Sequence, residues 1–104
     1  MNARATLETE KGSRYMAALC HHFGRKLETG LDGGSGWINF PFGRCELLAT
    51  DSMLNLRVAA QTAPELGKLK GVVTSHLERF AFRENPQLEW IGAPQGDGPT
   101  DLDQ

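Results

Sequence analysis

The stretch of residues 27–60 most constrains the fold, because it holds four strand-like segments joined by connections of only a few residues. Parallel neighbours need crossovers of a dozen or more residues, so short connections predict an antiparallel meander. The last segment alternates cleanly, with Leu54, Leu56 and Val58 on one face and polar residues between them. That alternation is typical of a strand buried on one side only. The predicted strands span residues 27–32, 37–40, 45–50 and 53–60.

Two amphipathic helices flank this meander. The first is predicted to begin after Thr9 as N-cap and to end near residue 26, with its apolar residues at helical spacing. The second begins with a capping box formed by Thr62 and Glu65, with Pro64 in the first turn, and ends near Phe82. Each helix carries one apolar stripe, so each is expected to cover one face of the sheet.

Two further strands are predicted, at residues 3–8 and 88–91, which gives the order β-α-β-β-β-β-α-β. Because every strand has one apolar face, two helices on one side of a curved antiparallel sheet bury all of them. We therefore expect an α+β two-layer sandwich. Residues 1–92 are predicted to form this single domain, and residues 93–104 a disordered acidic tail.

Charge and hydropathy exclude some functions. The chain has 104 residues, with 11 Lys and Arg against 13 Asp and Glu. Without the three tail carboxylates (Asp97, Asp101 and Asp103) the balance is 11 bases against 10 acids, which is far from the basic face of a nucleic-acid binder. No apolar run approaches the roughly 20 residues that a membrane helix needs. No apolar stretch near the N-terminus suggests a secretion signal, so we expect a cytoplasmic location with no membrane partner.

Four short motifs carry a resemblance to a known family. They are SRY at 13–15, LCHHF at 19–23, FPFGRCEL at 40–47 and SHLERFAFR at 75–83. In this order they resemble the bacterial domain-of-unknown-function family 2218 over roughly residues 4–91. The chain departs from the family pattern at Gly12 and His21, where Ala and a basic residue are usual. Neither change removes a candidate site residue.

The resemblance implies no assigned activity. Members of the family occur alone, and beside or fused to siderophore-interacting flavin reductases. The resemblance therefore implies a loose link to iron handling and a flavin-reductase-type partner, by association and not by mechanism.

One candidate site is a cluster of thiols and imidazoles. Because both helices should cover the same sheet face, His76 of the second helix can approach the first. Thiolate and imidazole together suit zinc or ferrous iron, and two thiols suit a redox disulfide. The alternative is that the cysteines are reduced core residues and that His76 bonds a backbone carbonyl, Glu78 or Tyr15. No pair has a recognised metal spacing, and a catalytic triad built on Cys45 and His76 rests on residue types alone. The candidate cluster comprises Cys20, His22, Cys45 and His76.

A second candidate is an anion site made by Arg14, Arg79 and Arg83. Arg79 and Arg83 lie one helical turn apart near the end of the second helix. Positive charge is favourable beside the carbonyls at a helix C-terminus, which explains both residues without a ligand.

The third candidate is the sheet face opposite the helices. Helices on one side only leave this face open, and exposed aromatic residues beside Asn and Arg are typical of a binding surface. Homodimerisation would bury the aromatic residues. The candidate residues are Trp37, Asn39, Asn55 and Arg57, and we extend this hypothesis to Trp90.

These observations favour a non-enzymatic binding or accessory module, linked to iron or siderophore metabolism through the family resemblance and self-associating as a homodimer. The alternatives are a Cys/His-dependent metal-binding or thiol redox protein and a purely structural homo-oligomerisation domain. The sequence points to no particular cofactor.

Overall fold

The computed structural model describes residues 1–86 and 88–93 of the chain. Its elements, in chain order, are β1 (Asn2–Glu8), α1 (Gly12–Phe23), β2 (Thr29–Asp32), β3 (Ser35–Phe40), β4 (Gly43–Ala49), β5 (Met53–Ala59), α2 (Ala63–Phe80), a short 3-10 turn η1 (Phe82–Glu84), and β6 (Ile91–Ala93). The predicted order of strands and helices is confirmed, and so is the α+β class.

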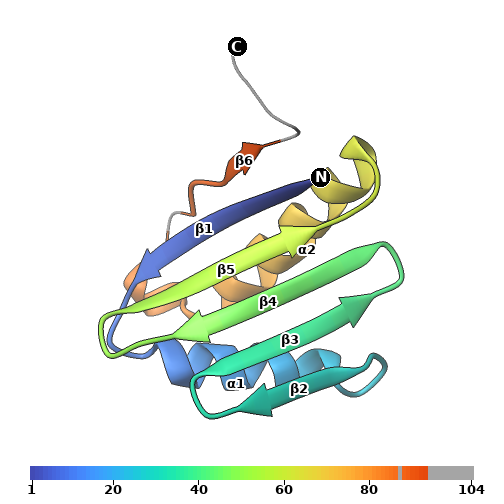
Figure 1. Ribbon diagram of the computed structural model, residues 1–104. Coiled ribbons are helices and arrows are strands. Elements are labelled where there is room, and N and C mark those ends of the chain that lie inside the picture. Colours follow the sequence, from blue (N-terminus) through green and yellow to red (C-terminus); the bar gives the residue numbers. More distant parts are fainter. Residues whose placement is uncertain (87, 94–104) are drawn as a thin grey trace.

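The strands form one six-stranded sheet in the order β2-β3-β4-β5-β1-β6 (Figure 1). Every neighbouring pair is antiparallel, as the short connections between β2 and β5 require. The first strand of the chain, β1, lies between β5 and β6. The two central strands of the sheet are therefore β4 and β5.

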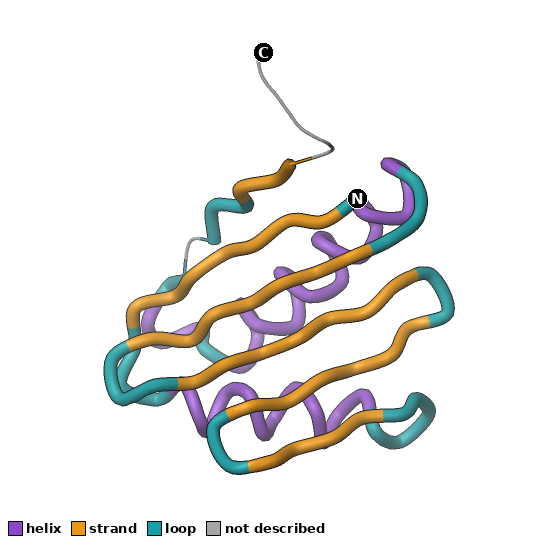
Figure 2. The backbone as a smooth tube through the Cα atoms, viewed as in Figure 1, coloured by secondary structure: helices purple, strands orange, loops and turns teal. Residues whose placement is uncertain are grey.

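Both helices lie on the same face of the sheet, and the other face is uncovered (Figure 2). Alternate residues of β1 and β5 point into the layer between the sheet and the helices, and these residues are buried while those between them are more exposed. The largest fully buried side chains are Met16, Leu19, Ile38, Leu54, Leu56, Leu69 and Leu77. Burial of these apolar side chains is the main stabilising contribution to the sandwich.

The start of α1 differs from the prediction. Lys11 is the N-cap and makes no side-chain capping bond, so the prediction of Thr9 was wrong. Thr9 is buried, and its Oγ1 accepts a hydrogen bond from the Lys11 backbone N–H at 3.0 Å and donates one to Glu84 at 3.0 Å. Gly12, the first helical residue, lies against the Met53 carbonyl, where a Cβ would come within 2.9 Å. Tertiary contacts therefore set this helix start.

The start of α2 agrees with the prediction. Thr62 is extended, and its Oγ1 accepts a hydrogen bond from the Glu65 backbone N–H at 3.2 Å and contacts the Glu65 carboxylate at 3.1 Å. The predicted N-cap and the proline in the first turn are confirmed, while the Glu65 carboxylate meets the Thr62 hydroxyl and not the Thr62 backbone N–H of a full capping box. The helix ends at Phe80, two residues before the predicted end, and η1 follows.

Several boundaries differ from the prediction. The first helix ends at Phe23 and not near residue 26, β2 begins at Thr29 and not at residue 27, and β4 spans Gly43–Ala49 and not residues 45–50. The β2–β3 turn is only Gly33-Gly34, with Gly33 at a φ of +61°, so β3 begins at Ser35. Glycine at a positive φ suits a two-residue hairpin. The last strand lies at Ile91–Ala93 and not at residues 88–91, because Leu88 and Trp90 pack against the core.

The predicted tail begins one residue too early, since Ala93 belongs to β6 and pairs with Asn2. The rest of that tail lies outside the described residues. Neither described helix is long and apolar enough to cross a membrane.

Candidate functional site

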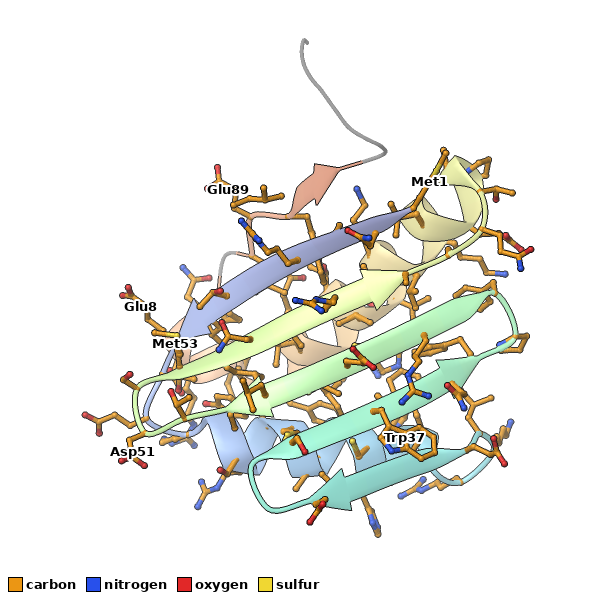
Figure 3. The ribbon with its side chains drawn as sticks, viewed as in Figure 1. Met1, Glu8, Trp37, Asp51, Met53 and Glu89 are labelled. Carbon is orange, nitrogen blue, oxygen red and sulfur yellow. The ribbon has the colours of Figure 1, made fainter. Side chains whose placement is uncertain are left out.

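The uncovered face of the sheet gathers the four predicted sheet-face residues. Trp37 and Asn39 of β3 and Asn55 and Arg57 of β5 alternate with buried residues of the same strands. Figure 3 shows Trp37 on the side of the sheet away from the helices. We call this surface the open face. Trp90 does not join it, because its indole Nε1 donates a hydrogen bond to Thr74 Oγ1 of α2 at 2.8 Å.

Trp37 is held in place by its neighbours on both sides. It pairs with Gly30 of β2, and a Cβ at Gly30 would overlap the indole. The Arg44 guanidinium of β4 lies 4.7 Å from the centroid of the Trp37 ring, within the range of a cation–π contact. The large aromatic side chain is therefore half-buried and fixed, although it is on the open face.

Arg44 organises this part of the open face, and the sequence reasoning missed it. Its Nη1 donates a hydrogen bond to Asn39 Oδ1 at 2.8 Å, and its Nε forms an ion pair with Glu46 at 3.2 Å. Arg44 and Glu46 alternate with the buried Cys45 and Leu47 on β4, and this alternation is the signal that could have placed both of them on the open face.

Two arginines stand directly opposite each other on the other half of the open face. Arg4 of β1 is the register partner of Arg57 of β5, and like charges in this position repel. Within the described residues, neither makes an ion pair with an acidic side chain. Both line a hollow of about 360 Å³, beside Thr6 and Asn55, which hydrogen-bond to each other at 3.0 Å. The pair is therefore available to an anionic group.

The two cysteines lie in the core on the covered face. Both are buried and unpaired in a disulfide, and Cys20 Sγ points towards the backbone carbonyls of Gly30 and Trp37 at 3.8 and 4.0 Å. Burial raises the pKa of Cys45 to about 12, with the nearby charges of Cys20 and Glu46 adding to the effect. Burial also raises the pKa of Cys20. Because the thiolate is the nucleophile and metal ligand, neither thiol is prepared for that chemistry.

The two histidines form a separate pair between α1 and α2. The ring centroids of His22 and His76 are 4.9 Å apart, and His76 also lies 4.7 Å from Phe23. His76 Nδ1 contacts the Val72 carbonyl at 2.8 Å, which is the backbone alternative considered from the sequence. Burial lowers the pKa of His22, and His76, Arg25 and Arg79 lower it further. The surroundings of His22 therefore disfavour its charged form.

The predicted Cys/His cluster is thus divided into a thiol pair and an imidazole pair. Cys20 and His22 are two positions apart on α1, and residues at this spacing point in different directions. In residues 1–86 and 88–93, no three His, Cys, Asp or Glu side chains converge as metal ligands would.

The three arginines of the predicted anion site lie in different surroundings. Arg79 is close enough to His22 to affect its pKa. Arg83 lies 5.8 Å from the ring of its neighbour Phe82. Arg14 lines a hollow of about 700 Å³ between α1 and β2, together with Arg25. No contact among the described residues unites Arg14, Arg79 and Arg83.

A polar contact that sequence reasoning missed joins η1 to α1. Glu84 accepts hydrogen bonds from the hydroxyls of Tyr15 and Thr9, and these bonds lower its pKa. Burial, with Glu84 adding to it, raises the pKa of Tyr15. Asn85 follows in the left-handed conformation, which ends the turn that presents Glu84. We call this contact the Glu84 latch. No local sequence pattern signals it, because its members are 69 and 75 positions apart.

The fold and the open face define a small two-layer α+β domain with one covered and one uncovered sheet face. Residues 4–91 match the family described as an uncharacterised protein conserved in bacteria, DUF2218, and the chain belongs to this family. The chain is also similar to PA4090 from Pseudomonas aeruginosa, solved by NMR, with a TM-score of 0.75 and 31% identity. That similarity covers 86% of this chain and 94% of the other. The search of curated proteins found no match.

Proposed function

We propose that this protein is a non-enzymatic binding module that works as a homodimer joined through its open face. The observation that carries the proposal is the composition of that face. It presents a fixed, half-buried Trp37, an exposed Leu48 on the neighbouring strand β4, and the pair Arg4 and Arg57, which makes no ion pair within the described residues. Aromatic residues and arginine are enriched at protein interfaces.

The chemistry of the covered face supports a non-enzymatic role. Its two thiols are buried and hold their protons, and the imidazoles that could activate them lie at another place between the helices. Nucleophilic catalysis needs a nucleophile within hydrogen-bond reach of a base. The open face offers binding groups instead.

The wider role that we propose is accessory to bacterial iron or siderophore metabolism, with a flavin-reductase-type protein as the partner of the dimer. The support is the family to which the chain belongs, whose members occur beside such reductases. Isothermal titration calorimetry with a siderophore-interacting flavin reductase from the same bacterium tests this role. Saturable binding is expected, and the absence of heat at several hundred micromolar would remove the reductase as the partner.

The substitution Trp37→Arg tests the dimer. It removes the aromatic surface and adds a positive charge to a face that already carries Arg4, Arg44 and Arg57, so the wild type should sediment as a dimer and the variant as a monomer. Phe82→Arg is the matched control, because Phe82 is 69% exposed on η1, away from the open face. It should leave the dimer unchanged. Far-UV circular dichroism checks that both variants fold.

A wild type that stays monomeric at several hundred micromolar would overturn the proposed homodimer. So would a Trp37→Arg variant that remains dimeric.

A further inference from the structure

We propose, resting on the homodimer above, that the two copies pack face to face about a twofold axis that runs between β4 and β5 and parallel to them. These are the middle strands of the order β2-β3-β4-β5-β1-β6. Rotation about this axis places β4 on the partner's β5, β3 on the partner's β1, and β2 on the partner's β6. All six strands then face a strand of the other copy.

One row of side chains crosses the whole open face and decides the fit. Its members are successive register partners on neighbouring strands, so they lie side by side across the sheet. We call this set the central row: Ile91, Arg4, Arg57, Glu46, Trp37 and Gly30.

The axis places opposite charges against each other. Glu46 faces the partner's Arg57, and the twofold symmetry makes this contact twice. Trp37 faces the partner's Arg4, which brings an aromatic surface to an arginine that makes no ion pair within the described residues. Within one copy Arg4 and Arg57 repel each other, and a second copy supplies the groups that offset this repulsion.

The sizes of the facing residues also match. At the edges of the central row, the Trp37 indole that lies over Gly30 comes to the partner's Ile91, whose side chain is 59% exposed. In the neighbouring row, Arg44 of β4 faces the partner's Ala59 on β5, since these two are register partners within each copy. Apolar groups therefore meet at the edges, and a large side chain meets a small one beside the axis.

The other in-plane twofold axis fits worse. An axis that crosses the strands along the central row would place each strand on its own copy. Arg4 would then face the partner's Arg4, Arg57 the partner's Arg57, and Glu46 the partner's Glu46. Like charges that face each other across an interface oppose association. The charges therefore select the axis parallel to the strands.

The expected affinity follows from the area of the open face. Strands about 4.8 Å apart with about 3.4 Å per residue give a face of roughly 25 by 23 Å. Two such faces bury roughly 1,100 Å², at the lower limit of stable interfaces. Face-to-face sheets align within about 30°, so the contacts nearest the axis, Glu46 with the partner's Arg57, should matter most. We expect a weak dimer that is sensitive to these two charges.

Charge reversal and mixing test the axis. The variants Arg57→Glu and Glu46→Arg each place like charges at both symmetric contacts, so each should raise the dimer dissociation constant at least tenfold. In an equimolar mixture, both contacts again pair opposite charges. The mixture should therefore form dimers under conditions where each variant alone is monomeric, as measured by sedimentation velocity at low salt. Glu78→Arg, on α2, is the matched control and should leave dimerisation unchanged.

The mixture separates contacts between copies from those within one copy. Glu46 and Arg57 are also neighbours within the chain, but mixing two variants cannot restore an intrachain pair. If Trp37→Arg abolishes the dimer and the mixture stays monomeric, the axis is wrong and the proposed homodimer stands. If either charge reversal alone leaves the dimer intact, the axis is also wrong. A monomeric wild type would overturn both proposals.

Discussion

Leu47 and Leu48 are neighbours on β4, yet Leu47 is 3% exposed and Leu48 is 51% exposed. The difference between them is the difference between the two faces of the sheet. One face is covered by α1 and α2 and is almost entirely apolar, and the other carries arginines, amides, a carboxylate and an aromatic ring. Successive residues of a strand point to opposite faces of the sheet. Alternate residues of one strand can therefore stabilise the core, while the residues between them are available for contacts with another molecule.

The largest expected effect comes from the same substitution on the two faces. Leu47→Ala should lower the free energy of unfolding by about 3 kcal/mol, because it leaves a cavity in the core. Leu48→Ala should change it by less than about 0.5 kcal/mol, since an exposed residue loses few contacts. Urea denaturation of both variants measures the contrast. Equal losses would mean that the open face also stabilises the isolated chain.

An intermediate effect is expected at the Glu84 latch, a polar contact on the covered side. Tyr15→Phe removes a hydrogen bond from a buried hydroxyl to a carboxylate and should cost about 1–2 kcal/mol. Urea denaturation at neutral pH measures this loss. A cost near zero would show that the sandwich depends on apolar burial alone.

The pH dependence of the same variant checks the cause. The pKa of Glu84 is lowered in the folded protein by the hydroxyls of Tyr15 and Thr9. Stability from this carboxylate is therefore present above its ordinary pKa of 4.5 and is lost as pH falls through the lower, folded value. The variant should lose less stability than the wild type on acidification below pH 4.5.

The smallest effect is expected at the imidazole pair. The pKa of His22 is lowered by burial and by neighbouring positive groups, so the unfolded chain binds its proton more readily than the folded chain. The wild type should lose stability as pH falls below the ordinary value of 6.5 towards the folded value. His22→Gln should flatten this slope, as measured by urea denaturation at several pH values. An unchanged slope would mean that His22 does not contribute to it.

The sequence predicted the faces of the sheet well, because strand alternation is local. Leu54, Leu56 and Val58 are buried and Arg57 is exposed, as the pattern indicated. The N-cap at Thr62 was also a local signal and is confirmed.

The remaining features depend on contacts between distant parts of the chain. Thr9 is a residue type that favours the N-cap position, but its hydroxyl donates a hydrogen bond to Glu84, 75 positions away. His76 was expected in one cluster with Cys20, His22 and Cys45, and the angular position of each residue on its helix brings it to His22 and not to the cysteines. Trp90 was placed on the open face, but Thr74 offers its indole a hydrogen-bond partner on the other side. No local pattern encodes such partners.

The two outer strands of the sheet are short, with four residues in β2 and three in β6. A long, flat outer strand offers a row of unpaired backbone groups on which further chains can add without limit. Here each edge strand offers only a few unpaired backbone groups to an incoming strand. In the proposed face-to-face dimer, the open face of each copy is fully used once two copies have met. Association should therefore stop at a finite particle, and concentrated solutions should resist the growth of fibres.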